Sequence, residues 1–262
     1  MPGFNATLGS GGLVVSRKRG YPTMYIENLR TIYTTGTTVT IDSGSCRDDS
    51  DVKDIILVNP TVCNIAVVGA NGLDVGVAAN NTWYYLFVIA DIQDGVPVAT
   101  LLSLSATAPN LPVGYNVQRR VGVVRRDNVG VFHLFAQSWT SRERLYIWDE
   151  TASLAAIDDF HVLRNGNAVV FTNVSCATAI PPVSTLAVLC LNLIAPNFDS
   201  MWVRPNGSTV VLPVCNITDN GYDGAVILIW IPTDNNGIVE YMVSNAVDAA
   251  HIMVCGFIDQ LD

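Results

Sequence analysis

The sequence predicts an all-β protein made of two β-sandwich or jelly-roll-like modules behind an extended N-terminal arm. Half of the 262 residues are hydrophobic and only 14% are charged. Thr, Val, Asn and Gly are plentiful, which is typical of many short strands joined by polar turns. Lys, a good helix former on surfaces, occurs only as Lys18 and Lys53. A chain of this length can bury the core of one large or two small β domains.

A Gly- and Ser-rich start and a crowding of charges near the middle divide the chain. The arm ends in Arg17-Lys18-Arg19, and it reads either as a disordered terminus or as an anchor for an acidic partner. The alternation of apolar and polar residues weakens over Trp148–Phe160. We expect the junction of the two modules there, with at most one helical turn, over Glu150–Ala156. The expected units are an arm, a first module and an acidic second module, at residues 1–20, 21–149 and 150–262.

Three turn signals in the second module predict β-hairpins. Asn165-Gly166 lies between apolar residues, as a type I′ turn requires. The other two are Pro205–Ser208 and Asp234–Gly237, each between runs of strand formers.

The distribution of charge along the sequence excludes some classes of binding partner. The formal net charge is −9, and from Asn165 to Asp262 the only Lys or Arg is Arg204, against eight Asp and Glu. Such a surface repels phosphate backbones and anionic lipids, so neither nucleic acid nor membrane is an expected partner. No run approaches the ~18–20 apolar residues of a spanning helix. The N-terminus lacks the apolar core of a signal peptide, so we expect the chain to be made in a host cytoplasm.

Cysteine and histidine give no metal or cofactor signal. The six cysteines include no CxxC pair, and most lie in apolar runs, so we expect buried free thiols. His133, His161 and His251 each adjoin apolar strand residues and are expected to be structural. No cofactor is predicted.

Carboxylates are the only catalytic material, and they cluster at Asp48, Asp49, Asp51 and Asp54. Two carboxylates at a suitable gap could hydrolyse a glycoside, and several together could hold Ca²⁺. The favoured interpretation is a solvated turn, where Asp is common for its own hydrogen bonding. No GxSxG, HExxH or phosphate-binding glycine loop is present. We therefore expect no catalytic residue and no enzyme.

Aromatic residues raise the question of glycan binding. Neighbours on a strand point to opposite faces, so Trp83 and Tyr85 should be buried and Tyr84 exposed. Tyr84 and Trp202 are the candidate glycan contacts, whereas Trp83 and Trp230 are expected in the core.

Basic residues are the candidate contacts to other subunits or to a capsid. Arginine is the cation that interfaces retain, because its planar fork pairs with carboxylates while its stem packs. We therefore expect the first module to face the particle and the acidic second module to face solvent. The candidates are Arg17, Lys18, Arg19, Arg119, Arg120, Arg125 and Arg126.

One long segment, about residues 69–128, resembles a segment of virion proteins of tailed bacteriophages, in the spike, head-decoration and tail-fibre group. It runs from a Gly-Leu-Asp turn through an Asn-Thr-Trp-Tyr-Tyr strand to a strand with paired arginines. More loosely, Val203–Ser208 and Trp230–Val243 resemble the usual ending of these proteins. The matching positions are Gly72-Leu73-Asp74, Asn81–Tyr85, Leu102-Ser103, Ala106–Pro109, Leu111-Pro112, Gly114-Tyr115, Arg119-Arg120 and Gly122.

The resemblance implies a non-enzymatic virion structural protein, such as a capsid decoration, spike or tail-associated knob. Its expected partners are other virion proteins and further copies of itself, with a homotrimer as the assumed state. The alternative function is a receptor-binding protein that binds or degrades a host surface polysaccharide. The expected location is the virion.

Overall fold

The computed structural model describes residues 22–139, 142–149, 157–209, 215–220 and 225–261, with the backbone of residues 8–9 and 12–13. Every regular element described is a strand, which confirms the all-β class. None of these residues forms a helix long and apolar enough to cross a membrane. Within the expected arm, β1 (Leu8–Gly9) pairs with β2 (Gly12–Leu13). Arg17, Lys18 and Arg19 lie outside the described residues, as does the segment Glu150–Ala156.

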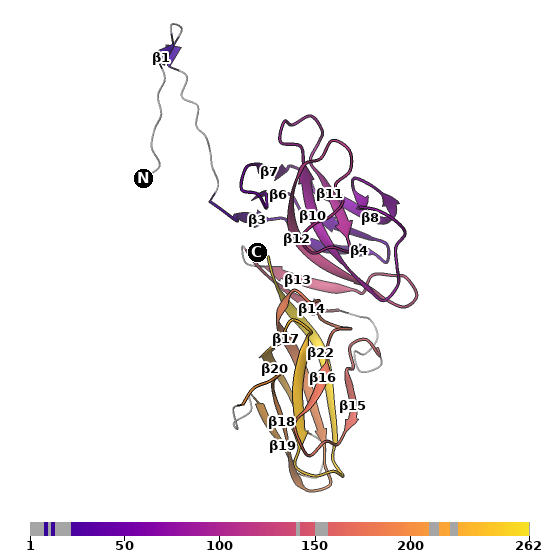
Figure 1. Cartoon of the computed structure of the whole chain (residues 1–262). Coiled ribbons are helices and arrows are strands. Elements are labelled where there is room, and N and C mark those ends of the chain that lie inside the picture. Colours follow the sequence, from indigo (N-terminus) through magenta and orange to yellow (C-terminus); the bar gives the residue numbers. More distant parts are fainter. Residues whose placement is uncertain are drawn as a thin grey trace.

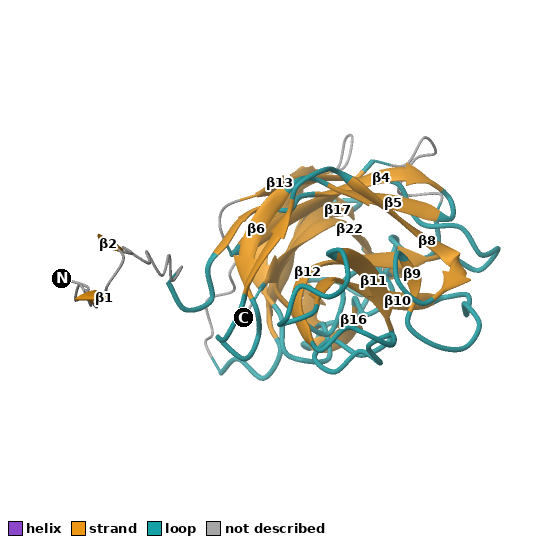
Figure 2. Cartoon of the chain, turned by 90° about the horizontal axis from the view of Figure 1, so that it is seen from above, coloured by secondary structure: helices purple, strands orange, loops and turns teal. Residues whose placement is uncertain are grey.

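Two sheets build the N-terminal module, drawn in indigo and magenta in Figure 1. The larger sheet curls, as the view from above shows (Figure 2). In spatial order its strands are β12 (Val117–Arg126), β10 (Thr82–Ala90), β11 (Ala99–Ser103), β9 (Gly72–Leu73), β8 (Thr61–Val68), β5 (Thr38–Ile41) and β4 (Thr31–Thr35). The smaller sheet consists of β3 (Ile26–Asn28), β6 (Gly44–Arg47) and β7 (Asp54–Leu57).

Two further sheets build the C-terminal module, in orange and yellow. The larger consists of β13 (Phe135–Trp139), β14 (Glu143–Trp148), β22 (Ala249–Gln260), β17 (Ser184–Ile194) and β20 (Ala225–Pro232), with β15 (Leu163–Gly166) also paired to β22. We call it the six-stranded sheet. The smaller consists of β16 (Thr172–Ser175), β21 (Ile238–Val243), β18 (Phe198–Pro205) and β19 (Cys215–Asn220).

The sheets divide the chain earlier than the sequence predicts. Strands β13 and β14 precede the expected junction, yet β14 pairs with β22 over five residue pairs. Strands β13 and β14 therefore belong to the sheet of the C-terminal module. The β13–β14 hairpin also touches the first module, where the backbone N–H of Thr31 donates to Oε1 of Gln137 at 2.9 Å.

Two of the three predicted hairpins are wrong in the same way. Asn165 has a φ of +52°, but Asn165-Gly166 lies inside β15, whose partner is β22, while β16 pairs with β21 in the other sheet. A turn does close between Asp234 and Gly237, yet β20 and β21 also belong to different sheets. Only the chain around Pro205–Ser208 joins two paired strands, β18 and β19. The Asp234–Gly237 turn forms as predicted but carries the chain from one sheet to the other, whereas Asn165-Gly166 forms no turn.

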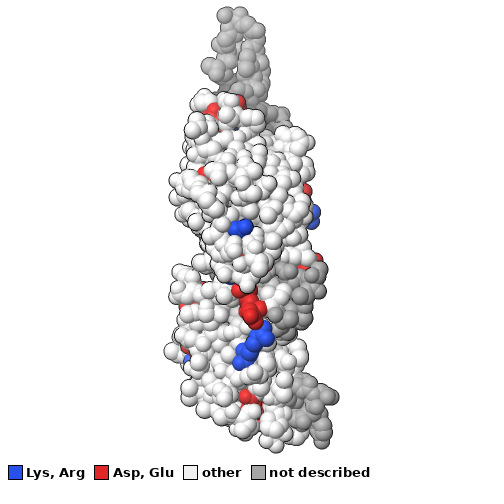
Figure 3. Space-filling model, turned by 90° about the vertical axis from the view of Figure 1, so that its right-hand side faces the viewer, with Lys and Arg blue, Asp and Glu red and all other residues white. Residues whose placement is uncertain are grey.

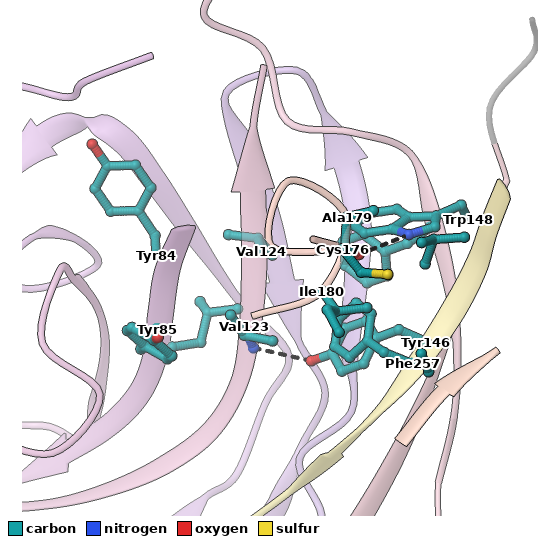
Figure 4. Close-up of a cluster of buried hydrophobic side chains, with 14 of the residues drawn as sticks. Tyr84, Tyr85, Val123, Val124, Tyr146, Trp148, Cys176, Ala179, Ile180 and Phe257 are labelled. Carbon is teal, nitrogen blue, oxygen red and sulfur yellow. Dashed lines mark hydrogen bonds between the residues drawn. The ribbon is translucent and has the colours of Figure 1, made fainter. Parts of the chain in front are cut away.

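A cluster of aromatic side chains fills the space where the two modules meet (Figure 4). Tyr146 stacks on Phe257 with ring centroids 4.7 Å apart, and Trp83 of the first module meets Phe257 edge-on at 5.7 Å. The hydroxyl of Tyr146 accepts a hydrogen bond from the backbone N–H of Val123 at 3.0 Å. Gly122 makes this approach possible, since a Cβ there would lie 2.7 Å from that hydroxyl oxygen.

Candidate functional site at the junction of the modules

Strand β22 belongs to the second module, but the first module holds its end, and Figure 1 shows the C-terminus beside that module. One guanidinium nitrogen of Arg120 donates to both carboxylate oxygens of Asp259, at 2.7 and 2.9 Å. A second donates to the carbonyl oxygen of Gln260 at 2.5 Å. Arg119 donates to the carbonyl oxygen of Leu261 and to Asp49, both at 3.3 Å. Adjacent arginines on β12 therefore bind one short piece of chain.

These contacts correct the expected role of the arginine-bearing strand. Arg119, Arg120 and Arg125 are buried within the chain, so they are not a surface for other subunits or a capsid. Arg126 is half-buried and donates to the carbonyl oxygens of Gly130 and Ala78 at 2.8 and 2.9 Å. The sequence identified cations suited to an interface, but the interface lies between the two modules of one chain.

The Arg120–Asp259 pair is buried, so water screens the attraction between its two charges only weakly. The carboxylate of Asp259 is 0% exposed, and charges in such surroundings interact more strongly than on a surface. The Arg120 guanidinium also lies 6.0 Å from the ring centroid of Tyr85. Burial raises the pKa of Tyr85, so this phenol stays neutral beside the pair at physiological pH.

A third arginine, Arg144 of β14, is fully buried next to this pair. It donates to the carbonyl oxygen of Asn28 at 2.8 Å, a contact from the second module to the first. Burial lowers the pKa of Arg144 from its usual value, while Tyr146 and Asp259 oppose that shift. Three arginines thus lie across the junction, each reaching a group of the other module.

A cleft of about 900 Å³ opens at another part of the junction. Asp159 sits within it, 3.5 Å from an Arg125 nitrogen and 3.1 Å from Nε2 of His133. Trp83 also lines the cleft, but its Nε1 donates to the carbonyl oxygen of Ala177 at 3.1 Å and Arg125 lies 5.5 Å from its ring centroid. The polar lining could accept a ligand rich in hydroxyl groups. Its remaining polar members are Asn81, Asp127, Asn128, Asp158 and Thr178.

The Asp48–Asp54 cluster has the geometry of a turn. Asp48 accepts hydrogen bonds from the backbone N–H groups of Ser50, Val52 and Lys53. Burial raises the pKa of Asp48, but the hydrogen bond from the Ser50 hydroxyl and these backbone bonds outweigh it and lower the pKa. Asp51 and Asp54 both pair with Arg47, at 2.9 and 2.8 Å, and Asp49 pairs with Arg119. The carboxylates thus have different partners, and no group of three or more metal-ligating side chains occurs among the described residues.

The predictions for the aromatic residues divide. Tyr84 is 0% exposed, so its assignment as a glycan contact is wrong. Its hydroxyl accepts from the N–H and donates to the carbonyl of Ala79, and both faces of β10 are covered. Trp202 is half-buried on β18 and stays a candidate. Trp83 is half-buried and packs against the core, so its prediction holds in part, whereas Trp230 is 47% exposed, which contradicts its predicted burial.

Sequence reasoning missed the residues that complete the junction, namely Asp259, Arg144, Tyr146 and Asp159. An Asp inside a strand-like run was the one available signal, because a carboxylate there needs a buried partner. It also missed that His161 and His251, ninety positions apart, lie side by side with ring nitrogens 3.2 Å apart. No protein-family model matches this chain, and no curated protein shows significant similarity to it.

Proposed function

We propose that this chain is a non-enzymatic structural protein of a bacteriophage virion, a capsid decoration, spike or tail-associated knob that mediates assembly or surface interactions. The proposal rests on the segment of residues 69–128 that resembles such proteins. The observation that carries it is that the polar residues of this segment are used to build the fold.

Asp74 illustrates this use. It is buried, and its carboxylate accepts hydrogen bonds from the Ser103 hydroxyl at 2.7 Å and from the Asn110 backbone N–H at 3.0 Å. It thereby ties the turn after β9 to the end of β11 and the loop beyond. Arg119 and Arg120 hold the end of β22, as described above. These are positions that a scaffold needs, and they support a role in architecture.

The proposed partners are other virion proteins and further copies of the chain, and the proposed location is the virion. The buried hydrogen bonds between the modules suit a protein that projects from a particle or links two of its parts. The trimer inferred from the resemblance remains part of the proposal.

Antibody labelling of purified phage particles tests the proposal directly. Particles of the phage that encodes the chain should carry label at fixed positions when viewed by negative-stain microscopy. An antibody that detects the chain in lysates but leaves purified particles unlabelled would overturn the virion assignment.

Polysaccharide binding or degradation is the second candidate function, favoured by the polar cleft and by Trp202. Purified chain incubated with host surface polysaccharide should release no reducing ends above a heat-inactivated control. Release at an enzymatic rate that Asp159→Asn abolishes would replace the structural proposal with a degrading enzyme. Binding without release, weakened by Trp202→Ala, would identify a glycan-binding role on the same scaffold.

A further inference from the structure

The outer face of the six-stranded sheet is mainly apolar. Strand alternation and register place one side chain in two from each strand on this face, away from the sandwich core. Asn192, His251 and Glu143 also lie on it, but nine of its side chains are apolar, and β20 contributes the most exposed ones. We call this set the apolar face: Leu145 and Ile147 of β14, Met253 and Cys255 of β22, Cys190 and Ile194 of β17, and Val226, Leu228 and Trp230 of β20.

Such a face is unusual on an antiparallel sheet with one side against a core, because its other side is normally polar. Val226, Leu228 and Ile194 are 65%, 57% and 53% exposed. Among the described residues β20 pairs only with β17, so it is also an edge strand. A long apolar edge strand left bare is a site of aggregation. The face therefore needs an occupant.

We propose that a second copy of this chain covers the apolar face. This inference rests on the proposed function, in which the chain works as an oligomer. It names the contact surface and replaces the trimer assumed there with a pair, because an isologous contact on one face closes after two copies. Four strands about 4.8 Å apart and about 25 Å long present on the order of 500 Å² of flat surface per copy. Two copies meeting there bury on the order of 1,000 Å², which reaches the lower range of specific interfaces.

Charge favours another copy over a partner of different chemistry. Two chains with a formal charge of −9 each repel one another wherever their acidic surfaces approach. Where the apolar side chains of this face meet, few like charges oppose one another, and Glu143 lies at its edge. Figure 3 shows one side of the molecule, where small groups of acidic and basic side chains lie on a mostly uncharged surface.

The relief of the face is also self-complementary. Val226, Leu228 and Trp230 stand out along β20, whereas Cys190 and Met253 on the neighbouring strands are only half-buried. A two-fold axis across the face sets the β20 side chains of each copy on the lower centre of the other, as an isologous contact requires.

Analytical ultracentrifugation of the purified full-length chain tests the inference. The natural chain should associate at about 100 μM, well above a micromolar dissociation constant. Leu228→Lys and Val226→Lys should each weaken association at least tenfold, because each would bury an unpaired ammonium group. The matched control is Val58→Lys, since Val58 is 76% exposed on the first module, and it should associate like the natural chain.

Circular dichroism at the same temperature checks that the lysine variants are folded. Both lysines replace exposed side chains, so the monomer should keep its fold. A natural chain that stays monomeric at about 100 μM, or lysine variants that associate unchanged, would refute the inference. So would a monomer that associates only after removal of residues 1–21, because that segment would then be the occupant. A monomer whose antibody labels virions defeats only this inference, whereas association without labelling defeats only the virion assignment.

Discussion

The junction of the modules and the apolar face invert the usual distribution of side chains. The junction buries Arg119, Arg120, Arg144 and Asp259 among aromatic rings. The apolar face leaves valine, leucine and tryptophan exposed on an otherwise acidic chain. The difference teaches that charge can be the internal contact of a β protein and apolar surface the external one. The buried charges of the junction are explained by their partners in the other module, and the exposed apolar side chains by the second copy proposed to cover them.

Asp259→Asn is the change expected to have the largest effect, and it acts at the junction. It leaves the Arg120 guanidinium buried beside a neutral amide, which should lower the free energy of unfolding by about 3–5 kcal/mol. Urea denaturation followed by tryptophan fluorescence measures the loss. Replacing both partners, with Arg120→Met and Asp259→Leu, should recover much of it, because no unpaired charge remains.

The matched control for that change is Asp158→Asn, which removes a carboxylate from the exposed Arg164–Asp158 pair. Its unfolding midpoint should match the natural chain, since solvent screens such pairs. Equal losses at Asp259 and Asp158 would show that the junction does not depend on its buried charge.

A pH titration should have a moderate effect, at the margin of the apolar face where His251 lies. Burial, then His161, then Arg164 lower the pKa of His251 below its usual 6.5. The unfolded chain therefore binds the proton more tightly, so stability is full above about pH 6.5 and falls as pH drops toward the folded pKa. His251→Gln should reduce this decline in urea midpoints between pH 7 and 5. A variant that declines as steeply as the natural chain would contradict the prediction.

Thiol labelling should reveal the smallest difference, one of rate. Cys63 and Cys176 are buried, and burial raises the pKa of each to about 12, so both should resist a thiol reagent until the chain unfolds. Cys190 and Cys255 on the apolar face are half-buried and should react first. Leu228→Lys should speed their labelling further by separating the copies. Mass spectrometry of samples taken at successive times from the native protein identifies which cysteines are labelled. Equal labelling rates at all four cysteines would contradict the prediction.

The sequence predicts strands and turns well here, but it does not predict which sheet follows a turn. Asp234–Gly237 is a sound turn sequence, and the backbone does close there. Whether the next strand returns beside the first or crosses to the opposite sheet depends on how the whole sandwich packs. Asn165-Gly166 fails more fully, because its positive φ serves an irregular stretch of β15 where the pairing with β22 shifts register.

The candidate site was predictable in its residues and not in its location. Paired arginines beside a valine-rich run indicate an interface correctly, but their partner Asp259 lies 139 positions away from Arg120. No pattern among the residues near Arg120 indicates a partner so far away in the sequence. Tyr84 fails for a similar reason, since strand alternation assumes one open face and β10 has none. The Asp48 turn was predictable because its hydrogen bonds are local, but the predicted solvation was wrong for Asp48, which is buried.

The place of β22 in the six-stranded sheet has a consequence for synthesis. This strand runs between β14 and β17, yet the ribosome makes it after every other described strand. Until it emerges, β14, β15 and β17 lack a neighbouring strand, and the guanidinium group of Arg120 lacks the carboxylate of Asp259. The N-terminal sheets can fold during translation, whereas the six-stranded sheet cannot form until its central strand, β22, has been made. A nascent chain interrupted before residue 249 would leave β14, β15 and β17 without this partner and become a target for chaperones or proteases.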